Sequence, residues 1–69
     1  MNKNIIRLPK VQNLTGLSRS TIYAYIQAGK FPTQIELGPR SRGWLESEIY
    51  EWISSRVSAS RTETKETVQ

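Results

Sequence analysis

The sequence predicts one small, mainly α-helical domain with a β-hairpin, because three helical stripes and one turn-rich segment follow each other in a distinctive order. The first two stripes, at about 9–14 and 19–28, are joined by a tight polar turn. Short runs at 34–37 and 43–45 then flank a Gly-Pro turn, as in a hairpin. This order is that of a winged helix-turn-helix, in which the hairpin is the wing. The 69 residues have room for one such domain, which we place at 5–56.

Residues 1–4 are polar and are expected to form a flexible N-terminus. Leu8, Val11 and Leu14 follow at intervals of three residues, which indicates one face of a short helix. Pro9 suits the first turn of that helix, because the missing N–H has no helical partner there.

The turn between the first two helices has residues with the conformations that such a turn needs. Gly16 lacks the Cβ that makes a left-handed exit from a helix costly. Ser18 is a good N-cap, since its hydroxyl can accept from an early N–H of the next helix. Ile22 and Ile26 recur four residues apart and give the second helix its inner face. We expect Gly29 to end this helix.

The hairpin and the third helix complete the domain. Ile35 and Leu37 alternate with polar neighbours, as in a half-buried strand, and residues 38–42 form a turn-rich tip. The third helix is expected to begin at 46 or 47 and to end near Arg56. Residues 57–69 lack large hydrophobic side chains apart from two valines and are expected to form a disordered polar tail.

The core is expected to contain the large apolar side chains of all these elements, including both tryptophans in structural roles. Its predicted members are Leu8, Val11, Leu14, Leu17, Ile22, Ile26, Phe31, Ile35, Leu37, Trp44, Ile49, Trp52 and Ile53.

Composition excludes several classes of function. The chain has no cysteine and no histidine, so it lacks a disulfide framework, a zinc site and the most common general base. The glutamates at 46, 48 and 51 complement a helix dipole and form no evident catalytic pair. We therefore expect no enzymatic activity, no metal and no cofactor. No apolar run approaches the ~20 residues that span a membrane, and no signal-peptide core is present, so a cytoplasmic protein without a membrane partner is expected.

The basic charge is concentrated in one part of the chain. Residues 1–45 contain seven lysines and arginines and one acid, whereas residues 46–69 contain three bases and five acids. Such clustering is the electrostatic signature of a nucleic-acid binder. Together with the helix-turn-helix pattern, it predicts that double-stranded DNA is the partner.

The outer face of the second helix combines one cation with hydrogen-bonding groups and has no carboxylate. We name Ser18, Arg19, Ser20, Thr21, Tyr23 and Gln27 as candidate DNA contacts of this recognition helix. Arg19, at the helix start, fits either a guanine edge or a phosphate. Ser20 and Tyr23 either bond to DNA or support the cap and the packing. Thr21 either contacts DNA or only completes the cap, and Gln27 is expected to face solvent or the DNA backbone.

The wing supplies a second set of candidates, Arg40, Ser41 and Arg42. A wing reaches the minor groove or the phosphates beside it, where arginine is favoured, although two solvated loop charges are the alternative. Lys10 and Lys30 are further candidates for backbone contacts.

These residues resemble those of the AlpA-type phage regulators, small winged-helix proteins related in fold to excisionases and to the DNA-binding domain of MerR-type regulators. The resemblance covers about residues 5–56. It is carried by Arg7–Val11, Thr15–Tyr23, Gly29–Pro32, and Leu37–Trp44 with the following Ile49, Trp52 and Ile53.

The resemblance implies a sequence-specific transcriptional regulator from a prophage or an integrative element that acts on integrase expression. It also leaves open a recombination directionality factor, or excisionase, that binds attachment-site DNA. A third possibility is a small interaction module that targets an integrase or another regulator. Because the apolar residues are used by the core, we expect a monomer in free solution, with pairing only at repeated DNA sites.

Overall fold

A computed structural model describes residues 4–64, and residues 62–64 as backbone only. The expected flexible N-terminus at 1–4 therefore lies outside the described residues except for Asn4. The last residues of the expected tail, 65–69, lie outside them as well.

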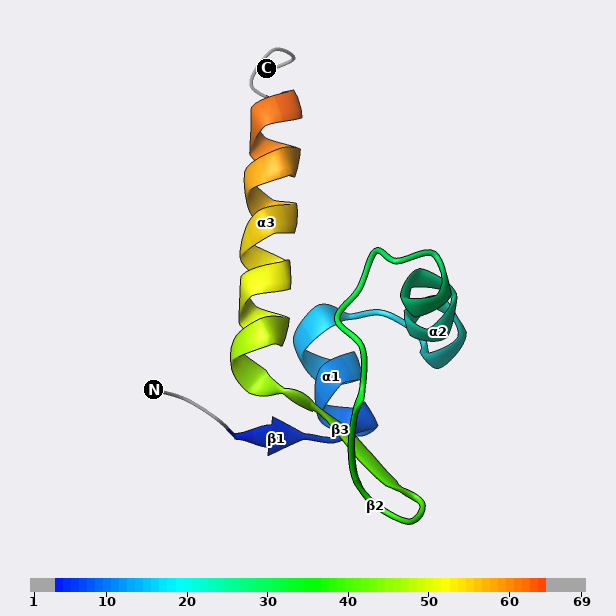
Figure 1. Cartoon of the computed structure of the whole chain (residues 1–69). Coiled ribbons are helices and arrows are strands. Elements are labelled where there is room, and N and C mark those ends of the chain that lie inside the picture. Colours follow the sequence, from blue (N-terminus) through cyan, green and yellow to red (C-terminus); the bar gives the residue numbers. More distant parts are fainter. Residues whose placement is uncertain (1–3, 65–69) are drawn as a thin grey trace.

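The described part of the chain has three helices and a small antiparallel sheet, and the hairpin of β2 and β3 extends away from the helices (Figure 1). The sheet has the order β1-β3-β2, so the last strand along the chain is the central one. This arrangement confirms the predicted class, a mainly α-helical winged helix-turn-helix. In chain order the elements are β1 (Ile5–Ile6), α1 (Leu8–Thr15), α2 (Arg19–Gln27), β2 (Ile35–Gly38), β3 (Ser41–Leu45) and α3 (Glu46–Thr64).

The turn between α1 and α2 has the expected geometry. Gly16 has a φ of 74°, and its N–H donates to the Gln12 carbonyl at 2.7 Å. The Thr15 hydroxyl donates to the Val11 carbonyl and accepts from the N–H of Leu17, which ties the turn to α1. These bonds close the last turn of α1 and hold the start of the connecting segment against it.

β1 was not expected from the sequence. It is two residues long and pairs with β3, with Ile5 opposite Leu45 and Ile6 opposite Trp44. So short a strand has no alternating pattern of its own, and only its partner strand defines it. A Cβ on the neighbouring Gly43 would lie 2.5 Å from the Ile5 side chain and 2.8 Å from the Ile6 carbonyl oxygen. Position 43 therefore requires glycine for β1 to pair with β3.

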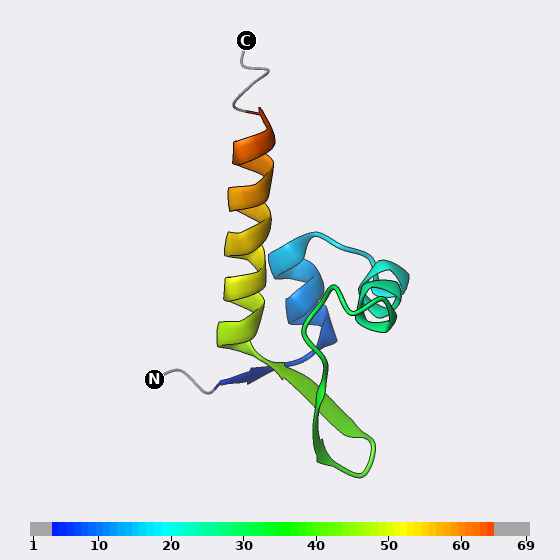
Figure 2. The ribbon, with the colours of Figure 1, turned by 45° about the horizontal axis from the view of Figure 1, so that its top comes forward.

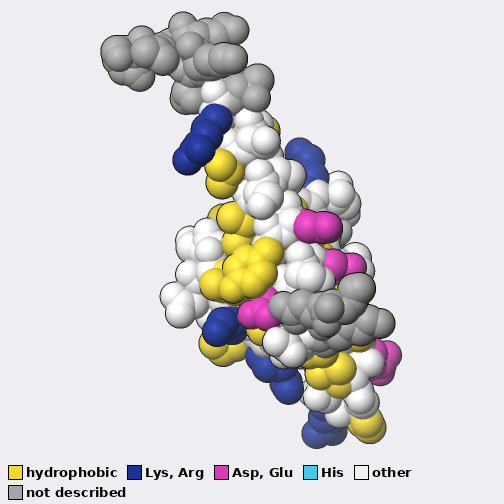
Figure 3. Space-filling model, turned by 90° about the vertical axis from the view of Figure 1, so that its left-hand side faces the viewer, with side chains coloured by type: hydrophobic (Ala, Val, Ile, Leu, Met, Phe, Trp, Pro, Cys, Tyr) yellow, Lys and Arg dark blue, Asp and Glu magenta, His cyan; other side chains and the backbone are white. Residues whose placement is uncertain are grey.

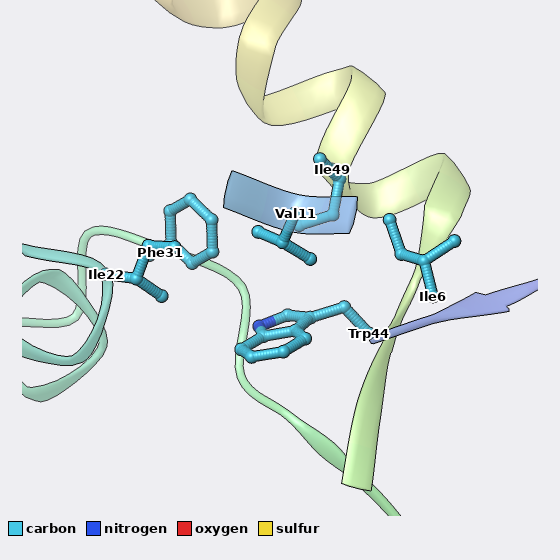
Figure 4. Close-up of a cluster of buried hydrophobic side chains, with 6 residues drawn as sticks. All are labelled: Ile6, Val11, Ile22, Phe31, Trp44 and Ile49. Atoms are coloured by element: carbon cyan, nitrogen blue, oxygen red, sulfur yellow. The ribbon is translucent and has the colours of Figure 1, made fainter. Parts of the chain in front are cut away.

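Among the described residues, six side chains form the buried core, and they come from five elements and one loop (Figure 4). Trp44 is fully buried, and its indole N–H donates to the Pro32 carbonyl at 3.0 Å. Trp52 is half-buried, packs edge-on against Phe31 at 4.8 Å between ring centroids, and donates to the Lys30 carbonyl at 2.7 Å. Both tryptophans thus have the structural role that was expected. The buried residues are Ile6, Val11, Ile22, Phe31, Trp44 and Ile49.

Two predictions about the core were wrong. Leu37 is 47% exposed, because the pairing of β2 with β3 shifts register between Glu36 and Gly38 and interrupts the alternation of faces. Ile6 is buried although it was not among the predicted core residues, since the strand that places it was not foreseen. The other predicted members are buried or half-buried.

The third helix is longer than the sequence indicated. The expected end near Arg56 was wrong, because α3 continues to Thr64 and includes residues that were assigned to a disordered tail. Residues 57–64 contain neither glycine nor proline, and each further residue of a helix adds a backbone hydrogen bond. Figures 1 and 2 show the end of α3 projecting beyond the other elements, and the molecule measures 50 × 29 × 20 Å.

Gly43→Ala should lower the free energy of unfolding by about 1–3 kcal/mol, because the added Cβ overlaps the backbone and side chains of β1. Gly38→Ala is the matched control, since nothing lies within 4 Å of a Cβ at that position. Thermal unfolding followed by circular dichroism compares the two. Equal stability of the two variants would show that β1 does not pack on β3 as described.

Removal of residues 58–69 should change the free energy of unfolding by less than about 1 kcal/mol, because the described side chains at 58–61 are all exposed. The thermal midpoint of the shortened chain, measured beside the complete one, tests this. A midpoint lower by several degrees would mean that this part of the chain docks on the domain.

Candidate nucleic-acid interface

The N-terminus of α2 is organised by a short network of hydroxyl groups. Ser18 is the N-cap, as predicted, and its Oγ accepts from the N–H of Thr21 at 3.2 Å. The same hydroxyl donates to Oγ1 of Thr21 at 2.9 Å and lies 3.5 Å from Oγ of Ser20. Ser18 and Thr21 therefore have capping roles, and Arg19 and Ser20 are exposed at the helix start.

Arg19 is positioned by Tyr23, one turn later on α2. Its guanidinium carbon lies 5.8 Å from the centre of the Tyr23 ring, within the range of a cation–π contact. The Tyr23 hydroxyl in turn accepts from the side-chain amide of Gln34 at 3.3 Å. Since Gln34 directly precedes β2, this bond connects the recognition helix to the base of the wing.

An open groove of about 620 Å³ lies between the start of α1, the side of α2 and the wing. Three exposed arginines, Arg7, Arg40 and Arg42, line it together with Tyr23, and none of the described residues that line it is acidic. A groove with this lining favours a polyanion. The complete lining consists of Arg7, Leu8, Pro9, Tyr23, Gln34, Arg40, Arg42 and Trp44.

Arg7 was not among the candidate contacts. It is the residue before α1, where it is the N-cap without a side-chain bond, and its carbonyl accepts from the N–H of Val11. A charge count includes Arg7, but only the pairing of β1 with β3 brings it into the groove with Arg40 and Arg42. A sequence pattern gives no sign of this proximity.

The wing tip is smaller than expected. Of the two wing arginines, only Arg40 lies in the turn. Arg40 occupies the turn with a φ of 64°, a conformation usually given to glycine or asparagine. Ser41 and Arg42 were expected in the loop but belong to β3, because the strands continue to within two residues of each other. Arg42 stands opposite Glu36, and both are exposed.

Three further candidates lie away from the groove. Lys10 and Gln27 are exposed on α1 and at the end of α2, and neither lines the groove. Lys30 lines a separate hollow with Trp52 and Arg56, beside α3. The structure therefore connects Arg19, Tyr23 and the wing. Lys10, Gln27 and Lys30 lie apart from this group.

Other kinds of site find no support among the described residues. No three acidic, histidine or cysteine side chains of the described part gather in a way that would hold a metal ion. Within 4–64, no helix is both long enough and apolar enough to cross a bilayer.

Comparison with known proteins agrees with this geometry. The family described as "Prophage CP4-57 regulatory protein (AlpA)" matches residues 4–57. An uncharacterized protein, ORF88, of Enterobacteria phage P4 is 45% identical over 56 residues, which cover 81% of this chain and 64% of that protein. The "DNA-binding transcriptional activator AlpA" of Escherichia coli K12 is 43% identical over 58 residues, which cover 75% of this chain and 83% of that protein.

The matched region includes every element from β1 to the first part of α3, and with it the helix-turn-helix, the wing and the three-arginine groove. The resemblance noted from the sequence is thereby confirmed. This chain belongs to the AlpA family of prophage regulatory proteins.

Proposed function

We propose that this protein is a sequence-specific DNA-binding transcriptional regulator and not an enzyme. The groove between the start of α1, the side of α2 and the wing is the observation that carries the proposal, because three arginines and no acidic residue line it. The name of the Escherichia coli relative, a DNA-binding transcriptional activator, supports the same assignment.

In the proposed complex α2 enters the major groove with its N-terminus foremost. Arg19 reads a base edge, with guanine O6 and N7 as the matching acceptors. Tyr23 restricts the guanidinium by lying beneath it, so less side-chain entropy is lost when the contact forms. Ser20, exposed beside Arg19, is available for a base or a phosphate.

Arg40, Arg42 and Arg7 contact phosphates in this proposal, or the minor groove beside them. Arg40 and Arg7 have the stronger claims, since Arg42 has the carboxylate of Glu36 opposite it on the neighbouring strand. We assign secondary roles at most to four candidates that neither line the groove nor lie at the start of α2: Ser41, Lys10, Lys30 and Gln27.

The target that we propose is DNA that controls an integrase gene on a prophage or an integrative element. The protein then acts in the cytoplasm, as a monomer in free solution. Family membership supports the prophage context.

Footprinting on two duplexes tests the target. We expect protection of the integrase promoter of the element that encodes the protein, and weaker or no protection of its attachment-site DNA. Protection of the attachment site alone would instead assign the protein as a recombination directionality factor. Failure to protect either duplex, combined with capture of the purified integrase, would assign an interaction module.

The recognition helix and the wing should give different effects when their arginines are removed. Arg19→Ala should reduce the difference in binding free energy between cognate and scrambled duplexes by about 1–3 kcal/mol. The double variant Arg40→Ala with Arg42→Ala should lower the affinity for the cognate and the scrambled duplex by similar factors. The single variant Arg7→Ala should do the same. These variants should also lower the slope of log K against log salt by roughly 1 for each phosphate that is no longer bound.

Titrations at several salt concentrations measure both quantities. Arg56→Ala is the control, because Arg56 is exposed on α3 and does not line the groove. If the wing variant lost discrimination while Arg19→Ala lost affinity uniformly, the two proposed roles would be reversed.

A further inference from the structure

Trp52 lines two surface hollows that α3 forms with the end of α2 and the loop after it. Its ring is half-buried, packs against Phe31 and donates a hydrogen bond to the Lys30 carbonyl, so the side chain is held in place at the surface. Aromatic side chains fixed in this way are typical of the centre of protein interfaces. We call the surface of both hollows the Trp52 face, and its members that carry the argument are Trp52, Lys30, Arg56, Glu48 and Glu51.

The two hollows have opposite charge. The basic hollow measures about 400 Å³, and Lys30 and Arg56 line it with no acidic residue among its described lining. The acidic hollow measures about 550 Å³, and Glu48 and Glu51 line it with no basic residue among its described lining. Figure 3 shows both signs of charge along α3, with acidic side chains beside its lower part and basic ones nearer its projecting end.

The charges of the Trp52 face are available to another molecule. Within residues 4–64, the charged groups of these two cations and two glutamates form neither an ion pair nor a hydrogen bond, and all four side chains are exposed. Opposite signs disfavour a nucleic acid, because phosphates drawn to the basic hollow would meet the carboxylates of the acidic one. A protein segment contains both signs together with apolar side chains, so it can match both hollows and cover Trp52.

We propose that the Trp52 face is the docking surface for a segment of a partner protein. Acidic residues of that segment pair with Lys30 and Arg56, an apolar side chain covers Trp52, and basic residues pair with Glu48 and Glu51. The order of the charges fixes the register of the segment. The contact itself needs no DNA, whereas its use in regulation rests on the DNA-binding function proposed above.

The Trp52 face and the arginine groove are separate surfaces. Neither hollow shares a lining residue with the groove. Figures 1 and 2 show α3 rising from the end of β3 away from the wing tip. A duplex in the groove therefore leaves the two hollows open to a protein bound beside it.

A peptide titration followed by NMR tests the docking surface without DNA. The probe is a capped peptide of three glutamates, two leucines and three lysines in that order, which has no net charge. We expect it to shift the indole N–H signal of Trp52, with the signal of the buried Trp44 as the internal reference. A peptide of the same composition with alternating charges should bind about tenfold more weakly, because it cannot match both hollows at once. No shift at Trp52, or equal binding of the two peptides, would overturn the proposal.

Two charge reversals test the two hollows separately. Arg56→Glu and Glu51→Lys should each lower the affinity for the block peptide about tenfold, because each replaces an attraction with a repulsion. Lys10→Glu and Glu36→Lys are the matched controls, since they make the same changes of charge at exposed residues that line neither hollow. Equal losses in the controls would mean that net charge alone attracts the peptide, and the proposal would be wrong.

Two further measurements distinguish other occupants. If Arg56→Glu lowered the affinity for a random-sequence duplex as much as that for the peptide, nucleic acid would be the occupant and the proposal would be overturned. Light scattering should show a monomer at the concentration of the titration, and a dimer that Arg56→Glu disperses would make a second copy the occupant instead. Failure of the DNA-binding function gives a separate result, because the unsubstituted chain then binds no duplex while the peptide titration still judges the Trp52 face.

Discussion

The burial of Trp44 is the constraint on which the rest of the structure depends. This side chain extends from the central strand into a core formed by α1, α2, α3, β1 and the loop after α2. Its indole N–H satisfies the Pro32 carbonyl, so a large ring is buried without leaving a polar group unpaired. Because β3 is also one strand of the wing, the same residue that fills the core fixes where the wing projects.

The DNA-facing features follow from this arrangement. The wing leaves the core at Trp44, passes Arg7 between β1 and α1, and is linked to α2 through the bond from Gln34 to Tyr23. Tyr23 then restricts Arg19. Hydroxyl groups cap α2, and no acidic side chain competes at its start. The interface is therefore built from a few polar side chains that a small core holds in place.

The two ends of α3 have different relations to the domain. Ile49 and Trp52 join its first turns to the core, whereas the described side chains from Ser54 to Arg61 are exposed. A helix that projects without packing partners offers its surface to another molecule.

The sequence by itself determined the elements whose signals are local. Gly16, Ser18 and Gly29 act through their own backbone or hydroxyl groups, and the positions of α1 and α2 followed from them to within about one residue. Only the tertiary structure decided the features that depend on residues far away in the sequence. Ile5 and Ile6 form a strand only because β3 pairs with them, and Leu37 is exposed because a bulge changes its face. Arg7 joins the wing arginines because β1 pairs with β3, a proximity between residues far apart in the chain that no local pattern encodes.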